Sequence, residues 1–196
     1  MSEEGADEGD DVEFRLPPGD RSLAGTIQQG RDFIGATLAF VDLSGADLYW
    51  ASFRGADLEG AILRDASLCG ATFHDAHLVG ADLSGADLSL DNIGGTTDFD
   101  RADLTGAKLV RARIGGAVFR NAKLVDADLS GASAATRLPD RPTRFDGADL
   151  TGAKLAGADL EGATYDGATR FPRGFDPRRA GMVEKEGRRK PRSNRL

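Results

Sequence analysis

Large apolar residues recur at every fifth position along most of this chain. Taking each of them as the centre of a unit, the sequence contains 26 units, and alanine stands two residues before the centre in 21 of them. The centres run without a break from position 33 to position 93, resume at 99 to 134 after one inserted residue, and resume again at 145 to 165. The repeat therefore governs the fold.

A period of five predicts short extended segments joined by corners. Side chains two residues apart share one face of an extended segment, so the alanine and the centre of each unit both point inward. The period fits neither a long strand nor a 3.6-residue helix. Glycine adopts backbone angles closed to other residues, and its frequent place two residues after the centre, as at Gly45 and Gly55, marks the corner.

A spacing of twenty residues between like centres indicates four units per coil. The phenylalanine centres Phe33, Phe53 and Phe73 have this spacing, and their column continues, across the one-residue insertion, through positions 93, 114 and 134. A second column holds Leu38, Leu58, Leu78, Phe99 and Phe119. We therefore predict an all-β fold, a four-sided parallel β-solenoid of six to seven coils.

Two interruptions alter the shape of the predicted rod. The segments 94–109 and 143–155 share the sequence Thr-x-Phe-Asp, which predicts that Phe145 rejoins the column of Phe99 and Phe119. Between them, residues 135–144 contain two prolines and three arginines. A narrow interior accepts neither residue type, so this segment is predicted to be a surface excursion.

The chain divides into three predicted parts. Residues 1–22 form an acidic disordered tail, 23–172 form the β-helix, and 173–196 form a cap remnant followed by a basic disordered tail. A solenoid exposes unpaired backbone at its ends. The aromatic and proline residues of 170–177 are predicted to cover the last coil and to stop further pairing. A vaguer cover is expected from residues 14–30.

Charge is distributed unevenly along the sequence. Residues 42–103 hold twelve acidic and three basic residues, whereas 104–144 hold three acidic and eight basic residues. The start of the chain has no basic or apolar region of a secretory signal, and no stretch of 18 apolar residues could span a membrane. These features predict a cytoplasmic location and no membrane partner.

The outward positions just before the centres predict an anionic ridge along one corner. Counting the face of Phe33 as the first, the third face carries Asp42, Asp82 and Asp103, and the fourth carries Asp47 and Asp87. Such a ridge is either a solvated surface or a docking face for a basic partner.

Three aromatic residues, Phe40, Tyr49 and Trp50, occupy outward or corner positions of the first predicted coil. Exposed aromatic side chains can anchor an interface. Alternatively, the N-terminal segment covers them. Together with the five aspartates of the ridge, these residues form the candidate interaction surface.

Residues with catalytic chemistry are few and scattered. His74 and His77 are expected to point outward on adjoining faces, and Cys69 is the single cysteine. No phosphate loop, metal motif or nucleophile–base order is present, and an interior closed by alanine leaves no room for a small molecule. We therefore expect no enzyme activity, no cofactor, no metal and no small-molecule substrate. Nucleic acid is expected to bind at most weakly, through the basic C-terminal tail.

The stretch AFVDLSGADLYWASFRGADLEGA, and the remainder of residues 31–171, resembles the pentapeptide repeat family. The resemblance implies a right-handed quadrilateral β-helix, in agreement with the four-unit count. The function that it implies is less definite, because members of the family do different things. Some of them mimic the charge and width of duplex DNA and bind type II topoisomerases, protecting them from quinolones.

Two hypotheses for function follow. The first is a non-catalytic, rigid scaffold or regulator that binds an unidentified protein partner through its faces. The second, which comes from the family resemblance, is a DNA mimic that binds gyrase.

Overall fold

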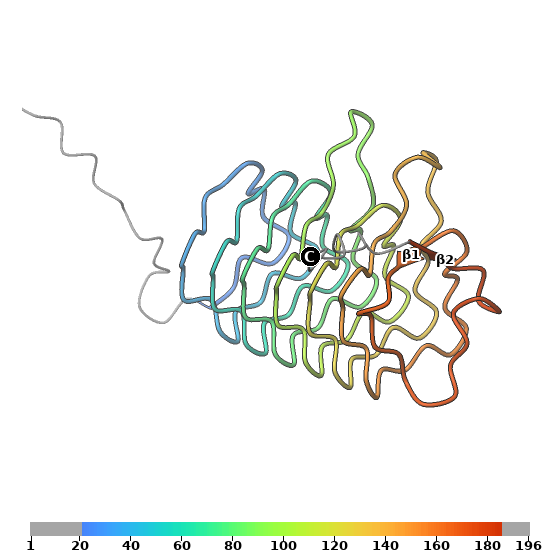
Figure 1. Ribbon diagram of the computed structural model, residues 1–196. Coiled ribbons are helices and arrows are strands. Elements are labelled where there is room, and N and C mark those ends of the chain that lie inside the picture. The colour runs from blue at the N-terminus through green and yellow to red at the C-terminus, as the bar shows by residue number, and fades with distance from the viewer. Residues whose placement is uncertain (1–20, 186–196) are drawn as a thin grey trace, which may run out of the picture.

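The computed structural model of the chain describes residues 21–185. These residues form a right-handed quadrilateral β-helix, a rod of coils stacked along one axis (Figure 1). The predicted fold class is therefore confirmed. The predictions made for residues 1–20 and 186–196 lie outside the described residues.

Parallel backbone pairing between successive coils builds four flat faces. On the first face, Asp32 pairs with Ser52 and Ser52 with Thr72, each step being twenty residues. The central residue donates its amide to the next coil, as Phe33 N does to the Ser52 carbonyl at 2.7 Å. Within the described residues, pairing extends beyond a single residue only between strand β1, Thr164–Tyr165, and strand β2, Val183–Glu184.

The corners are two-residue turns with a left-handed second residue. The carbonyl of a centre accepts the amide of the alanine three residues later, as in Ala36 N to Phe33 O at 3.1 Å. The second turn residue has positive φ, which glycine adopts without strain; Gly45, for example, has φ 62°. Between residues 21 and 185, eight residues other than glycine also adopt positive φ, among them Phe40 at 59° and Trp50 at 57°.

The interior is filled by the centres and their alanines. Six phenylalanine rings stack along the first face with centroids 4.7 to 5.2 Å apart and planes within 8° of parallel. This ladder, whose members are fully buried, consists of Phe33, Phe53, Phe73, Phe99, Phe119 and Phe145. The prediction that Phe145 rejoins the column of Phe99 and Phe119 is confirmed.

The predicted register between residues 88 and 99 is wrong. Phe73 stacks on Phe99, so the phenylalanine column does not pass through Ile93, and Phe99 belongs to the first face rather than the second. Ile93 is 81% exposed and lies in a loop. The bridged positions Thr72 and Asp98 are 26 residues apart, so the insertion in this coil has six residues, and not one.

The rod is longer than predicted at both ends. The regular pairing already includes Ser22, which bridges to Asp42, and β2 pairs with β1 beyond Pro177, so the prolines of 170–177 do not end the pairing. On three of the faces, seven successive coils are joined by backbone pairing, and on the first face eight are joined. Phe171 and Phe175 pack against the last coils, as predicted for a cap. Within residues 21–185, no helix has the length and hydropathy needed to cross a membrane.

Candidate interaction surface

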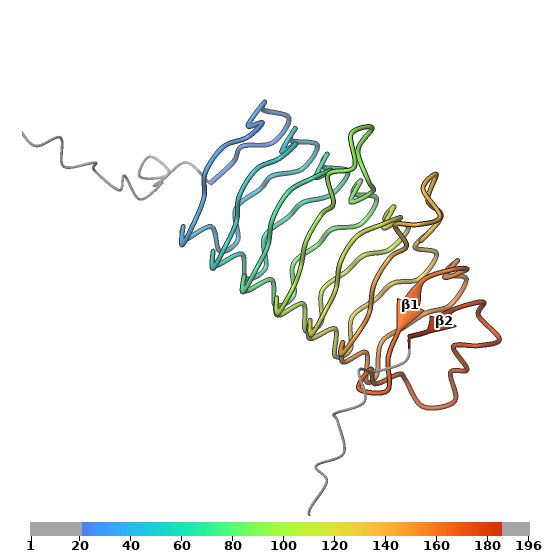
Figure 2. The same cartoon turned by 45° about the horizontal axis from the view of Figure 1, so that its top comes forward.

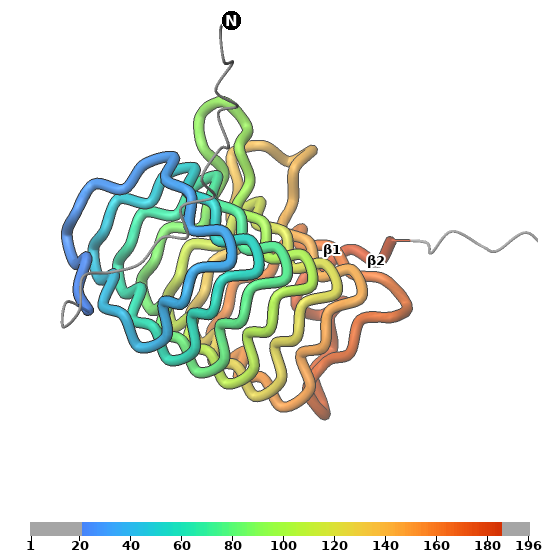
Figure 3. Tube along the Cα trace, turned by 90° about the vertical axis from the view of Figure 1, so that its left-hand side faces the viewer, coloured from blue at the N-terminus to red at the C-terminus, as the bar shows by residue number. Residues whose placement is uncertain are grey.

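Two long loops interrupt one corner of the rod. At the corner between the fourth and first faces, here called the loop corner, residues 89–96 connect Leu88 to Thr97 and residues 135–142 connect Ala134 to Thr143, each replacing a two-residue turn. Both loops project from the same side of the rod (Figures 1, 2 and 3). The first is green and the second orange in these views.

A buried threonine returns the chain to the rod after each loop. Thr97 and Thr143 stand where most units have alanine, and both are fully buried. Their hydroxyls donate hydrogen bonds to the carbonyls of Leu68 and Ile114 at 2.8 and 2.7 Å. The shared Thr-x-Phe-Asp sequence therefore marks the place where a loop ends and the first face resumes.

The two loops contact each other and the turn between them. Arg141 of the second loop donates from Nη1 to the carbonyl of Gly94 in the first loop at 2.7 Å. The intervening turn is Gly115–Gly116. A Cβ atom on Gly115 would overlap the carbonyl oxygen of Ala135, and one on Gly116 would overlap the Leu90 side chain. The loop corner is thus a single packed unit.

The first loop also reaches back to the preceding coils through Asp91. One carboxylate oxygen of Asp91 accepts the Tyr49 hydroxyl at 2.8 Å and the Trp50 indole N–H at 2.9 Å. The other accepts the amides of Ile93 at 2.9 Å and Gly95 at 2.6 Å. The indole lies against Gly95, leaving Trp50 47% exposed. Sequence reasoning placed Asp91 inside a repeat unit and missed this role.

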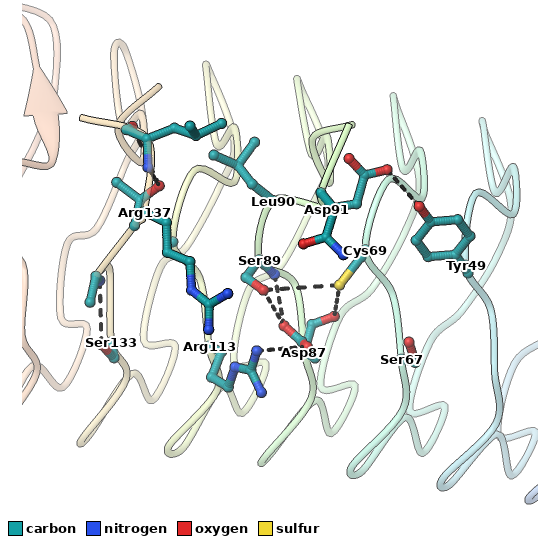
Figure 4. A pocket seen from close by; sticks show the side chains of 15 residues that line it. Tyr49, Ser67, Cys69, Asp87, Ser89, Leu90, Asp91, Arg113, Ser133 and Arg137 are labelled. Carbon is teal, nitrogen blue, oxygen red and sulfur yellow. Dashed lines mark hydrogen bonds and ion pairs between the residues drawn. The ribbon is translucent and has the colours of Figure 1, made fainter. Parts of the chain in front are cut away.

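A groove runs along the fourth face beneath the loops. It has a volume of about 620 Å³ and its lining includes Ser67, Asp87, Arg113 and Ser133 of the face and residues of both loops. Figure 4 shows Arg137 extending from the second loop toward Arg113. Neither arginine was singled out from the sequence, because Arg137 belongs to no repeat position and its direction cannot be read from spacing.

The structure divides the predicted aromatic cluster. Tyr49 and Trp50 lie together at the loop corner, with ring centroids 6.3 Å apart. Phe40 follows Leu38 of the second face and lies at the diagonally opposite corner, where its ring covers Gly60. Phe40 and Trp50 therefore belong to two separate surfaces.

The predicted anionic ridge is only partly correct. Asp42 and Asp82 share the third face, and Asp47 and Asp87 share the fourth, as expected. Asp103, however, lies on the second face between His77 and Lys123, because the first loop is longer than the sequence suggested.

The aspartates of the ridge also have a structural role that explains their regular spacing. Each accepts the amide two residues later, which would otherwise lack a partner at the start of the corner. The distances are 2.9 Å for Asp42, 3.3 Å for Asp47 and 3.1 Å for Asp82, Asp87 and Asp103. For Asp42, hydrogen bonds from the Ser44 hydroxyl and amide lower the pKa.

Cationic side chains one coil away neutralise several of these carboxylates. Arg113 pairs with Asp87 at 3.1 Å and Lys123 with Asp103 at 3.1 Å, while Asp82 contacts Arg64 at 2.7 Å. A continuous anionic surface is therefore restricted to the first coils, where Asp42 and Asp47 have no ion pair with the described residues.

The remaining residues with reactive chemistry lie apart. Cys69 lines the groove, where burial, followed by the nearby Asp87 carboxylate, raises the pKa of its thiol. His74 pairs with Asp98 at 2.7 Å on another corner. Within residues 21–185, no three histidine, cysteine, aspartate or glutamate side chains are grouped as metal ligands.

Comparison with known proteins identifies the family. The repeat pattern described as pentapeptide repeats matches in eight copies over residues 23–55, 32–66, 51–89, 97–133 and 143–164. The chain therefore belongs to the pentapeptide repeat family. No curated protein sequence matches it.

Several solved structures are similar to this chain. Full-length QnrB1, a plasmid-mediated fluoroquinolone resistance protein, is 19% identical, with 84% of this chain and 79% of that chain covered and a TM-score of 0.48. The pentapeptide repeat protein alr5209 from Nostoc PCC 7120 is 32% identical, covering 79% and 85%, with a TM-score of 0.24. HetL from Nostoc sp. strain PCC 7120, involved in heterocyst differentiation regulation, is 23% identical, covering 86% and 90%, with a TM-score of 0.24.

The hydrogen bonds of Asp91 predict a pH-dependent loop. Burial raises the pKa of Asp91, but hydrogen bonds from Tyr49, from the Gly95 and Ile93 amides and from Trp50 outweigh it, so the pKa lies below its ordinary value. The stabilisation is therefore present above about pH 4, the pKa of an unperturbed aspartate, and is lost as the pH falls through the lowered pKa. We expect the emission of Trp50, the only tryptophan, to be constant from neutral pH to pH 5 and to shift to the red below pH 4.

The control for this titration is Asp91→Ala, which removes the acceptor at every pH. Its emission should already be shifted to the red at pH 7 and should show no further transition below pH 4, while circular dichroism confirms an intact rod. The same acid transition in both proteins would contradict the assignment to Asp91.

Proposed function

We propose that this pentapeptide repeat protein is a non-catalytic scaffold that binds a protein partner at the loop corner. The observation that carries the proposal is the position of the two insertions. Both eight-residue loops leave the same corner and are joined by the Arg141–Gly94 hydrogen bond, whereas every other turn between residues 33 and 165 has two residues. A regular rod that departs from its repeat on one side presents a specific surface there.

The composition of the loop corner supports an interface. Trp50, Ile93 and Leu138 are 47%, 81% and 38% exposed, and the second loop adds Arg137 and Arg141 to the same corner. Tryptophan and arginine are enriched among residues that dominate binding energies. Trp50 also adopts positive φ, a strained conformation for a bulky residue that glycine would relieve. Such strain at an exposed position favours a functional role.

The available side chains favour a role without catalysis. The interior of the described rod is filled by fully buried side chains. Burial keeps the Cys69 thiol protonated, and a thiol is a weaker nucleophile than a thiolate. His74 is engaged by Asp98.

The alternative of a DNA mimic that binds gyrase has less support. A mimic of duplex DNA requires an extended anionic surface. From the fourth coil onward, however, a lysine or arginine of the next coil pairs with the aspartate on the same face. The pairs are Asp87–Arg113, Asp103–Lys123 and Asp128–Lys154. These pairs interrupt the negative potential along three faces.

Site-specific photo-cross-linking in the native cells tests the scaffold proposal. A benzophenone amino acid placed at Ile93, in the first loop, is expected to capture one specific protein. The matched control is Ile34, which is 52% exposed at the corner between the first and second faces and should capture none. Capture at neither position, or of the same proteins at both, would remove the support for the loop corner as the interface.

A further inference from the structure

The groove on the fourth face has the dimensions of a short extended peptide. Its lining residues come from five successive coils, from Tyr49 through Ser67, Asp87 and Arg113 to Ser133. Coils of this kind are about 4.8 Å apart, so five levels span about 19 Å, and an extended chain covers that length with about six residues. The loops wall one side of the groove, and the flat fourth face forms its floor (Figure 4).

The acidic groups that line the groove are already engaged. Both oxygens of Asp91 accept hydrogen bonds from Tyr49, Trp50 and loop amides. Asp87 accepts the amide and hydroxyl of Ser89 on one oxygen and contacts Arg113 with the other at 3.1 Å. Little acceptor capacity remains for a ligand, so these carboxylates do not favour a basic one.

The cationic groups, in contrast, retain free donors. A guanidinium has five N–H donors, and Arg113 contributes one nitrogen to its ion pair with Asp87. Arg137 has no hydrogen bond or ion pair with any residue from 21 to 185 and extends toward Arg113. Two converging guanidinium groups repel each other unless an anion lies between them, and they bind a carboxylate in a defined geometry.

Apolar side chains from both loops complete the lining. Leu90 of the first loop rests on Gly116, and Leu138 of the second loop is 38% exposed. The hydroxyls of Ser67 and Ser133 on the floor, and that of Ser89 in the first loop, also line the groove. The groove therefore offers two apolar side chains beside placed hydroxyl and guanidinium groups, and a ligand site combines contacts of both kinds.

We infer that this groove binds an extended peptide segment of the partner, with an acidic side chain between Arg113 and Arg137 and an apolar side chain against the loop leucines. A nucleic acid fits less well, because Asp87 and Asp91 would face its continuous chain of phosphates. The inference rests on the proposed function, since it assigns the chemistry of the partner at the loop corner. The proposed function and this inference can fail independently, because cross-linking at Ile93 tests the loop corner as an interface and peptide selection tests the groove.

Selection of peptides on the intact protein tests the inference. A library of linear twelve-residue peptides displayed on phage is selected on the full-length chain, and the enriched peptides are synthesised with a fluorescent label. We expect them to share an acidic residue near an apolar one. Fluorescence anisotropy should show at least tenfold weaker binding to Arg137→Gln, and a similar loss when the acidic residue of the peptide is replaced by its amide.

The matched control is Arg54→Gln, which removes an exposed arginine across the first face from the groove and should leave the affinity unchanged. Enrichment of peptides without acidic residues, failure to enrich any peptide, or equal affinity for the wild type and Arg137→Gln would overturn the inference. Arg137-dependent binding of a labelled 20-nucleotide single-stranded DNA in place of the peptides would also overturn it, by assigning the groove to nucleic acid.

Discussion

Replacement of Phe99 by alanine is expected to lower the free energy of unfolding by about 3 to 5 kcal/mol, the usual cost of removing a buried aromatic ring. Phe99 is fully buried, and its ring stacks on Phe73 at 4.7 Å and on Phe119 at 5.1 Å. The substitution removes both stacking contacts and leaves a cavity that the neighbouring backbone, fixed by pairing on both sides, closes poorly. Because each coil is stabilised by its neighbours, a defect at this central level weakens both halves of the rod.

Urea unfolding followed by circular dichroism measures this effect, and Phe99→Leu is the control. Most centres of the other three faces are leucine, and leucine leaves a smaller cavity than alanine, so Phe99→Leu should cost clearly less than Phe99→Ala. A loss below 1 kcal/mol for the alanine variant, or equal losses for alanine and leucine, would show that the ring ladder contributes little.

The regular part of this fold can be predicted from the sequence because each unit must satisfy the same local requirements. The five-residue period, the alanine before each centre and the twenty-residue spacing of Phe33, Phe53 and Phe73 together indicated four faces, and the paired positions are indeed twenty residues apart. Periodicity of this kind reflects the packing of the interior, where one large and one small side chain fill each side of the coil.

The first loop was misplaced because Ile93 stands five residues after Leu88 and mimics another centre. Asp91, two residues before Ile93, indicates instead that this segment is not a repeat unit. It occupies the position at which most units place alanine, and an unpaired carboxylate is not tolerated in a closed interior. An aspartate there indicates that the chain has left the rod, and the structure shows its carboxylate outside, bound to Tyr49 and Trp50.

Contacts between the two loops could not be predicted from spacing, since Arg141 and Gly94 are 47 residues apart and belong to no repeat position. One local signal was nevertheless present. A regular turn of this rod has at most one glycine, at its second residue, but the turn between the loops has two, Gly115 and Gly116. The extra glycine reflects the close approach of the second loop.

Gly115→Ala is therefore expected to displace the second loop. Gly115 does not adopt positive φ, so alanine is compatible with its backbone, but the new Cβ would overlap the carbonyl oxygen of Ala135. A backbone atom cannot rotate away as a side chain can, and the loop must move as a unit. Overpacking of this kind costs about 1 to 3 kcal/mol. Here it should destabilise the docked position of the loop and leave the stability of the rod unchanged.

Limited trypsin digestion detects the displacement, because the loop contains a cleavable bond after Arg137, whereas the bond after Arg141 precedes a proline. We expect cleavage after Arg137 to become several-fold faster in Gly115→Ala, since detachment exposes the loop backbone to the protease. Gly167→Ala is the matched control, because Gly167 also lacks positive φ and has open space where the Cβ would lie. If both variants were cleaved at the wild-type rate, the second loop would not depend on Gly115 for its position. If Gly115→Ala alone were cleaved faster and also lost affinity for the acidic peptides, the docked loop would be a requirement for the groove.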